Sequence, residues 1–367
     1  MTLAVLAGCS LQGADLSPDA ADSTGATDGS SIFNGSQINA IYGSAQVSTF
    51  AGAVGSASHV DGMGAAARLY GPEGMGFNGT SIYVAEPGSH TLRSLDPLTA
   101  AVGTAAGTAF SPGFSASQLG YPRDVEALGG QLFVSEPQYS IIGLVLPPVH
   151  VVGAGIASNM YGYVDGPAAS ARFWGPSALV AVGTDLYIAD SNNHVIRRFD
   201  TLSGMVTTFA GKFLEGKIVD GPAAQARFLG PQALATDGIS LFVGEVQSFK
   251  IRKISLATGT VTTLSGVGGL SGQVDGAAAQ AQFGIVTELL YSGGSIYVSD
   301  AGNHSIRKVN AATGDVSTVA GRRDHQGFSD GAGSIASFNR PVGLALAAGA
   351  LFVSDSRNHV IRRITGF

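Results

Sequence analysis

Apolar and polar positions follow a pattern that recurs six times along the chain. Each copy has an apolar run ending in a small residue and an acid, then a short polar turn, then a second alternating run, as in LYIADSNNHVIRRFD at 186–200. Two such runs separated by a turn predict a β-hairpin. The acids that end the first run lie at intervals of 50, 54, 55, 55 and 55 residues and are Glu86, Glu136, Asp190, Glu245, Asp300 and Asp355.

Every period contains two further apolar segments. A β-branched run ending in glycine precedes a loop of roughly twenty residues that usually carries an Asp-Gly pair. A strand often led by Gly-Pro follows the loop, as in GPSALVAV at 175–182. Four strands per period of this length are typical of a propeller blade. The sequence therefore predicts an all-β, six-bladed β-propeller with four-stranded antiparallel blades.

The order of the strands also predicts how the ring closes. The chain ends after the third strand of the sixth repeat, and a spare strand, Val47–Gly52, precedes the first repeat. We expect this strand to pair with the last blade, near 360–364. Closure of the ring removes the exposed sheet edges that otherwise promote aggregation.

At this point a family resemblance is visible. The pattern VTTFAG…VDGPAAQARFLGPQALA…LYIADSNNHVIRRFD, which runs from Val47 to the end, resembles the NHL repeat, especially its long bacterial version. The resemblance implies an NHL-type six-bladed propeller. The second repeat departs most, because it lacks the Asp-Gly and Asn-His pairs. The fourth repeat reads EVQSFKIRK where others read DSNNHVIRR.

The composition agrees with many short strands, since 45% of residues are apolar, 13% are charged and 53 are glycine. No run of about twenty apolar residues predicts a membrane-spanning helix. The net charge of −6 argues against nucleic acid as a partner.

The amino terminus carries a second resemblance. Leu6-Ala7-Gly8-Cys9 resembles the lipobox of bacterial lipoproteins, in which the cysteine becomes the lipidated terminus, and Cys9 is the single cysteine. No basic residue precedes the short apolar run, as expected if the true start codon lies upstream of Met1. The alternative is an incidental thiol. Ser10 after the cysteine favours the outer membrane.

Three segments follow from this interpretation. Residues 1–9 are a truncated signal peptide with the lipobox, residues 10–46 a flexible linker and residues 47–367 the propeller. The linker has too few large apolar residues to offset its ordering entropy. We expect an extracytoplasmic protein of the bacterial cell envelope, in contact with the membrane only through a lipid at Cys9.

Several repeated polar residues are expected to build the blade. Equivalent histidines lie far apart around the ring, so no metal site is expected from them. The strand-end acid is expected to accept hydrogen bonds from its own turn, and Asn193 to adopt a left-handed conformation there. The aspartate of each Asp-Gly pair is expected to cap a short helical turn. One member of each Arg-Arg or Arg-Lys pair faces the next blade and needs one of these acids as its partner.

Positions that differ between repeats are the candidates for recognition. Residues just before the innermost strand are expected to rim the axial opening, and they include aromatic and arginine side chains, which dominate recognition surfaces. A shorter loop in the second repeat should leave a notch beside Tyr121 and Tyr139. Neutral variation is the alternative. The candidate rim residues are Tyr70, Tyr121, Tyr139, Trp174, Leu229, Ile285, Asn339 and Arg340.

Two functions fit these features. The first is a monomeric, non-enzymatic binding or scaffold propeller without a cofactor, which recognises a protein, peptide or glycan through the rim. The second is a lyase or a lactonase-like hydrolase with its site in the central opening. In the related six-bladed enzymes the active residues come from non-repeated positions near the axis, and no motif here permits a carry-over. The enzyme hypothesis predicts clustered Asp, Glu, Asn or His at the axis and a bound ion.

Overall fold

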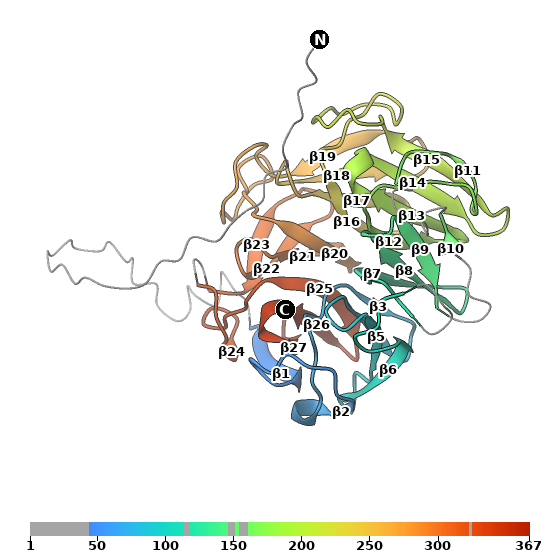
Figure 1. The fold of residues 1–367 in the computed structure, drawn as a ribbon. Helices are drawn as coiled ribbons and strands as arrows, with labels where there is room; N and C mark the ends of the chain where they lie inside the picture. Colours follow the sequence, from blue (N-terminus) through green and yellow to red (C-terminus); the bar gives the residue numbers. More distant parts are fainter. Residues whose placement is uncertain (1–43, 114–117, 146–150, 154–160, 323–324) are drawn as a thin grey trace, which may run out of the picture.

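The computed structural model describes residues 44–113, 118–145, 151–153, 161–322 and 325–367. Cys9, the lipobox and nearly all of the predicted linker lie outside the described residues. Six sheets are arranged in a ring (Figure 1). The predicted all-β, six-bladed propeller is therefore confirmed. Three sheets have four strands, and three carry an additional two-residue strand at the outer edge.

The first three blades follow the order of the chain. Blade 1 contains β2 (Gly62–Met63), β3 (Met75–Phe77), β4 (Ile82–Glu86), β5 (Thr91–Leu95) and β6 (Ala101–Gly107). Blade 2 contains β7 (Asp124–Leu128), β8 (Gln131–Glu136), β9 (Ile141–Leu144) and β10 (Val151–Val152). Blade 3 contains β11 (Gly166–Pro167), β12 (Pro176–Val182), β13 (Asp185–Asp190), β14 (Val195–Asp200) and β15 (Met205–Gly211).

The remaining blades include the one that closes the ring. Blade 4 contains β16 (Pro231–Thr236), β17 (Ser240–Glu245), β18 (Lys250–Ser255) and β19 (Val261–Ser265). Blade 5 contains β20 (Val286–Ser292), β21 (Ser295–Asp300), β22 (Ser305–Asn310) and β23 (Val316–Ala320). Blade 6 contains β24 (Gly331–Ala332), β25 (Pro341–Ala347), β26 (Ala350–Asp355), β27 (Val360–Thr365) and β1 (Gln46–Gly52). Three 3-10 turns are η1 (Gly64–Ala66), η2 (Ser191–Asn193) and η3 (Ser356–Asn358).

The ring closes as the sequence predicts. Strand β1 pairs antiparallel with β27, from Gln46 opposite Thr365 to Gly52 opposite Val360. Gly52 has φ 92°, and a Cβ at this position would lie 2.6 Å from the carbonyl oxygen of His359. This close approach explains why the outer strands of the repeat end in glycine.

Hydrophobic contact between neighbouring sheets makes the core. Phe173 is fully buried and packs with Phe133 of blade 2 and Ile188 of blade 3. Burial of one large apolar side chain contributes about 1.5–3 kcal/mol. The same loop position supplies a fully buried phenylalanine to four blades, namely Phe173, Phe228, Phe283 and Phe338.

Two sequence-based predictions about the hairpin turn are wrong. The left-handed residue is His194 (φ 60°), whose N–H closes the 3-10 turn on Ser191. Asn193 is instead buried and donates to Asp190 (2.8 Å) and to the carbonyl of Gly162 (2.8 Å). The carboxylate of Asp190 is held by this side chain and by Trp174 N–H (2.7 Å) rather than by the amides of its own turn.

The prediction for the Asp-Gly pair is also wrong, while that for the paired bases is confirmed. Asp165 does not cap a helical turn but accepts from Thr208 N–H (3.0 Å) and from the guanidinium of Arg197 (2.6 Å). Arg197 is fully buried and also binds Asp190 (2.9 Å). A long, buried cation attracts both acids more strongly than free amides do. The same pair of contacts surrounds Arg93, Arg252, Arg307 and Arg362.

Candidate ligand-binding mouth of the axial opening

The inner strands of the six blades, β3, β7, β12, β16, β20 and β25, surround the axis (Figure 1). The candidate rim residues precede these strands, except Tyr139, which lies in the β8–β9 turn. Blade-building acids hold the backbone of the segments before the strands. Tyr70 N–H donates to Glu86 (3.3 Å), and Asn339 N–H donates to Asp355 (2.7 Å). The backbone is therefore fixed by repeated residues, which leaves the rim side chains free to differ.

The repeated histidines join one blade to the rim of the next. His359 of blade 6 accepts a hydrogen bond at Nδ1 from Gly71 N–H of blade 1 (3.0 Å). His194 accepts from Gly230 N–H (3.1 Å) in the same way. Burial lowers the pKa of both imidazoles, which favours the neutral form that can accept at Nδ1. Their role is structural, as expected from their spread around the ring.

The structure distributes the predicted rim residues around the mouth and does not gather them into one cluster. Within this set, the rings of Tyr121 and Tyr139 stack with centroids 6.1 Å apart. Trp174 stacks on Tyr161, at 5.1 Å. Ile285 is exposed, and Leu229 is half-buried at its place in blade 4. The remaining ring and ion contacts are Tyr70 on His359 (5.9 Å) and Arg340 on Glu73 (3.1 Å).

One further ring of variable residues was not predicted from the sequence. In each inner strand, one apolar residue pairs with the second strand of the same blade, as Leu179 pairs with Ile188. The variable position lies two residues before this apolar residue in the chain. This position holds six different residue types in six blades, and comparison of the repeats one strand further inward could have found it. Its members are Glu73, Arg123, Ser177, Gln232, Thr287 and Val342.

A groove of about 210 Å³ crosses the mouth over blades 2, 3 and 4. Asn192 and Gln247 come from hairpin turns, and their carboxamides lie over two glycines of its floor. A Cβ at Gly175 would lie 2.6 Å from Asn192 Nδ2, and one at Gly230 would lie 3.2 Å from Gln247 Cδ. The groove is lined by Arg123, Pro137, Gly175, Ser177, Ser191, Asn192, Gly230, Gln232, Val246 and Gln247.

The polar groups of this groove differ in how much of their bonding capacity is used. The hydroxyl oxygens of Ser177 and Ser191 lie 2.7 Å apart, and each hydroxyl is within donating distance of a backbone carbonyl of blade 4, Gln232 O for Ser177 and Pro231 O for Ser191. In the described part of the chain, the carboxamides of Asn192, Gln232 and Gln247 make no hydrogen bond. Among the described residues, the hydrogen-bonding capacity of these three groups is therefore unused.

Arg123 lies at one end of the groove and is part of a chain of charges. Its guanidinium is 3.7 Å from Glu73, and Glu73 also binds Arg340 at 3.1 Å. The three side chains connect blades 2, 1 and 6 across the mouth. The carboxylate between them partly offsets the positive charge at the groove.

A chamber of about 170 Å³ lies along the inner strands of all six blades. A belt of apolar residues is repeated around it, for example Leu179, Leu234 and Leu289. Asp124, Glu126 and Glu288 also line it. Asp124 pairs with Ser135 and Glu288 with Ser299, so both occupy one repeat position in opposite blades. The other four blades have small residues there, which is the signal that sequence comparison could have used: Gly74, Ala178, Ala233 and Gly343.

These carboxyls sit in an unusual electrostatic environment. Burial raises the pKa of Asp124 and of Glu126 to about 7. Burial, and then the nearby Asp124, raise the pKa of Glu288 well above its ordinary value. Asp124 accepts from Leu179 N–H (2.8 Å) and Glu126 from Ala181 N–H (3.0 Å), both on β12 of the next blade. At neutral pH the chamber is therefore only partly ionised.

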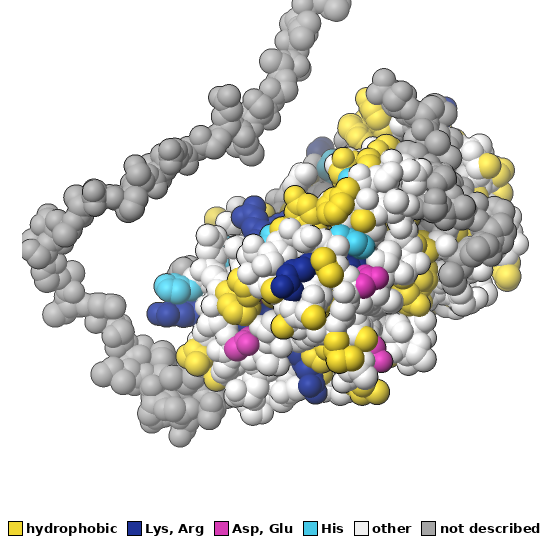
Figure 2. Space-filling model, turned by 60° about the horizontal axis from the view of Figure 1, so that its bottom comes forward, with side chains coloured by type: hydrophobic (Ala, Val, Ile, Leu, Met, Phe, Trp, Pro, Cys, Tyr) yellow, Lys and Arg dark blue, Asp and Glu magenta, His cyan; other side chains and the backbone are white. Residues whose placement is uncertain are grey.

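Among the described residues, no three His, Cys, Asp or Glu side chains are grouped so that they could hold a metal ion. In the same part of the chain, no helix has the length and apolar character needed to cross a membrane. On the face shown in Figure 2, basic side chains are scattered singly among neutral ones.

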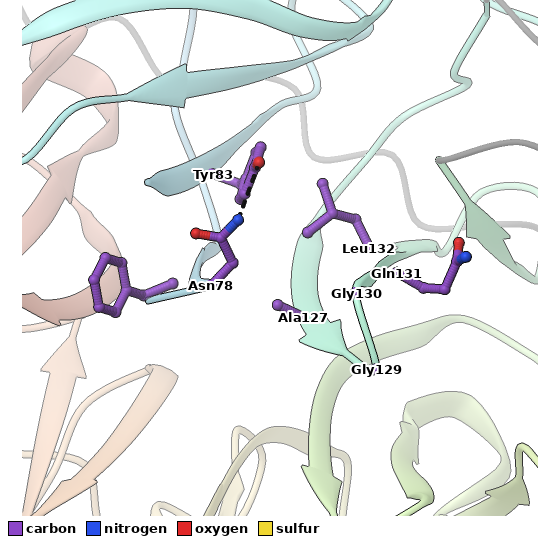
Figure 3. Close-up of a pocket in the computed structure, with 8 residues that line it drawn as sticks. Asn78, Tyr83, Ala127, Gly129, Gly130, Gln131 and Leu132 are labelled. Atoms are coloured by element: carbon purple, nitrogen blue, oxygen red, sulfur yellow. Dashed lines mark hydrogen bonds between the residues drawn. The ribbon is translucent and has the colours of Figure 1, made fainter. Parts of the chain in front are cut away.

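A further hollow of about 290 Å³ lies between blades 1 and 2, at the opposite end of the inner strands from the mouth. Asn78 and Tyr83 face Ala127 and Leu132 across it (Figure 3). The Asn78 amide donates to the hydroxyl of Tyr83 (3.3 Å), and its oxygen accepts from Ser81 N–H (2.9 Å). Its carboxamide is thus committed to the turn, unlike those of the mouth groove.

No family model matches the chain. It is 31% identical over 197 residues to SUPPRESSOR OF QUENCHING 1 of Arabidopsis thaliana, which covers 50% of this chain and 18% of that protein. It is 24% identical over 331 residues to human NHL repeat-containing protein 2, which covers 82% of this chain and 40% of that protein. The chain thus spans less than half the length of these curated relatives.

Solved structures share the fold at low sequence identity. An auxiliary nutrient-binding protein from Bacteroides thetaiotaomicron matches with a TM-score of 0.66 and 17% identity, over 87% of this chain and 76% of that one. A streptogramin B lyase matches with a TM-score of 0.52 and 12% identity, over 89% and 99%. Together with the sequence relatives, the six blades support an NHL-type β-propeller.

Proposed function

We propose that this protein is a non-catalytic binding propeller that takes its ligand in the groove at the mouth of the axial opening. The observation that carries the proposal is the contrast between repeated and variable positions. Acids, arginines and histidines that build the blade recur, whereas the variable position before the inner strands, occupied by Glu73, Arg123, Ser177, Gln232, Thr287 and Val342, holds six different residue types. Three carboxamides without partners in the described chain converge on one groove there.

The proposal includes a place in the cell. Lipidation of Cys9 would tether a monomeric propeller to the outside of the bacterial envelope, with the lipid as its single membrane contact and without nucleic acid as a partner. The Bacteroides propeller of similar fold is an auxiliary nutrient-binding protein, which supports a binding function. Metabolic labelling with a fatty-acid probe tests the anchor. Label that is lost in Cys9→Ser supports it, and equal label in both proteins contradicts it.

Thermal-shift screening tests the binding role. Neutral oligosaccharides, amino acids and short peptides are each titrated against the wild type, Gln247→Ala and Arg357→Ala. Arg357 is exposed and occupies the position of Gln247 in blade 6, away from the groove, so its variant is the matched control.

A ligand at 100 times its Kd stabilises the folded state by about 2.7 kcal/mol. We expect such a shift for the wild type and for Arg357→Ala, and a loss of most of it in Gln247→Ala. A ligand whose shift is unaffected by Gln247→Ala binds elsewhere and contradicts the proposal. The same holds if no compound shifts the wild type.

A propeller enzyme is the second candidate, because the axial chamber holds Asp124, Glu126 and Glu288. The pKa of Asp124 and of Glu126 is raised to about 7, which suits general acid–base catalysis at neutral pH. The fold is also shared with a streptogramin B lyase. Elemental analysis of the purified protein separates the candidates, since a stoichiometric divalent ion favours the enzyme.

A further inference from the structure

We propose that the mouth groove binds a neutral carbohydrate, an inference that rests on the proposed binding function and names its ligand class. The groove offers both hydrogen-bond donors and hydrogen-bond acceptors on a shallow polar floor. Its open shape suits a chain of sugar rings laid across blades 2, 3 and 4.

The three available carboxamides are the first argument. Each supplies an acceptor oxygen and two donor hydrogens, which matches hydroxyl groups that both donate and accept. Asn192 lies in the β13–β14 turn, Gln232 at the start of β16 and Gln247 in the β17–β18 turn. The sites therefore come from two neighbouring blades, so that adjacent hydroxyls of one sugar or of two linked sugars can be bonded together.

The charge of the groove is the second argument. Arg123 is the one charged side chain among the described residues that line it, and Glu73 lies 3.7 Å from that guanidinium. A strongly anionic ligand would compete with this carboxylate, and a cationic ligand finds no acid among these lining residues. A neutral, hydroxyl-rich ligand meets no uncompensated charge.

The apolar lining is the third argument. Pro137 and Val246 are the lining side chains without polar atoms, and both are half-buried. They can cover the C–H face of a sugar ring. A peptide gains affinity mainly by burying large side chains in deep pockets, and two small surfaces provide little room for them.

The single tryptophan provides a direct measurement. Trp174 precedes the floor residue Gly175, and its carbonyl accepts from Asn192 N–H (3.1 Å). Intrinsic fluorescence of the full chain is titrated with hexaoses of glucose, xylose and mannose that carry no charge. Parallel titrations use uncharged hexapeptides that contain no tryptophan. Immobilised arrays of neutral glycans and of peptides extend both arms.

The expected result is saturable binding of at least one neutral glycan, weakened tenfold or more by Gln232→Ala or by Gln247→Ala and less than twofold by Arg357→Ala. Unchanged melting temperatures show that the variants fold. Binding of peptides alone, lost in the same variants, overturns the carbohydrate assignment and leaves the binding function standing. Binding of neither class, on solution titration and arrays, overturns both.

Discussion

At the scale of single residues, two side chains of the hairpin turn compensate each other in length in five of the six blades. The strand-end acid is hydrogen-bonded to the residue three places later, and the two residues change size in opposite directions. Asp190 is paired with Asn193 at 2.8 Å, while Glu86 is paired with Ser89 at 2.8 Å. Aspartate, the shorter acid, is paired with asparagine, and glutamate, the longer acid, is paired with the shorter serine. The other pairs are Asp300 with Asn303, Asp355 with Asn358, and Glu245 with Ser248.

This compensation predicts a non-additive double mutant. Asp190→Glu adds a methylene to a fully buried site, which should cost about 1–3 kcal/mol. Asn193→Ser removes the donor to Gly162 O and should cost about 1–3 kcal/mol. The double variant has the pairing of blades 1 and 4, so we expect it to recover at least about 1 kcal/mol of the summed loss. Guanidinium chloride unfolding measures all three variants, and simple additivity would show that the two sites are not coupled.

The second blade lacks the buried arginine that lies beside the strand-end acid in the other five blades. Gly143 stands where other blades have the buried arginine, and a Cβ on it would lie 3.2 Å from Glu136 Oε1. Burial raises the pKa of Glu136 to about 7. The carboxyl is held by Gly120 N–H at 2.6 Å and, within the described chain, has no guanidinium beside it. The repeat that departs most in sequence thus also lacks the buried cation beside its strand-end acid.

At the scale of strands, β7, the inner strand of blade 2, is hydrogen-bonded through its side chains to β12, the inner strand of blade 3. Asp124 and Glu126 of β7 accept hydrogen bonds from two N–H groups of β12. These amides point from the inner edge of a sheet, where no further strand bonds them. The carboxyls satisfy them but are themselves desolvated, which explains their raised pKa values.

The raised pKa of Glu126 predicts a dependence of stability on pH. The folded state holds this proton up to a pKa of about 7, while an unfolded glutamate releases it near 4.5. The unfolded chain therefore binds fewer protons in this window, and the free energy of unfolding falls as pH rises through it. Glu126→Gln removes the titration and keeps an acceptor for Ala181 N–H.

We expect Glu126→Gln to be more stable than the wild type at pH 8 by about 1–3 kcal/mol, with the difference shrinking towards pH 4. Urea unfolding at several pH values measures the difference. Asp315→Asn removes an exposed carboxylate and controls for net charge. A difference that is constant with pH would mean that Glu126 does not titrate in this window.

At the scale of the whole molecule, the fold depends on one pairing between residues far apart in sequence. Strand β1 lies between β24 and β27 and completes the sixth sheet (Figure 1). Ala45 and Val47 are buried against Ile364 and Phe338, so the strand also contributes to the core. Its loss would expose a sheet edge and part of that core together.

Truncation tests this closure. Removal of residues 1–52 should lower the melting temperature by more than about 10 °C or make the protein aggregate, since several buried side chains and a full strand ladder are lost. Removal of residues 1–43 keeps every contact that β1 makes with the described residues and is the control, which should melt within about 2 °C of the full chain. Equal melting of the two truncated proteins would refute closure by β1.

Local sequence patterns were sufficient to predict the structure where neighbouring blades repeat the same contact. The alternation of the hairpins predicted the strands, the period predicted six blades, and the Arg-Arg pairs predicted a buried cation between blades. The turn was misread because its geometry depends on contacts outside it. Asn193 is held by the carbonyl oxygen of Gly162, which lies outside the four-residue turn. The Asp190 carboxylate binds the buried Arg197, an acid partner that the paired bases already indicated, rather than the turn amides. The role of the candidate rim residues in binding stays a prediction, because their position at the mouth does not show what they contact.

The sequence alone determined the architecture, because one repeated apolar pattern can bury its faces only by stacking blades, and a displaced strand can be paired only by closing the ring. The tertiary structure decided which polar and ionisable side chains lie together in one site. Folding brought the turn residues Asn192 and Gln247 to the same groove as Gln232, and set Asp124 and Glu288 around one chamber from opposite blades. These groups are far apart along the chain, and their environment depends on which neighbours desolvate them or use their hydrogen bonds.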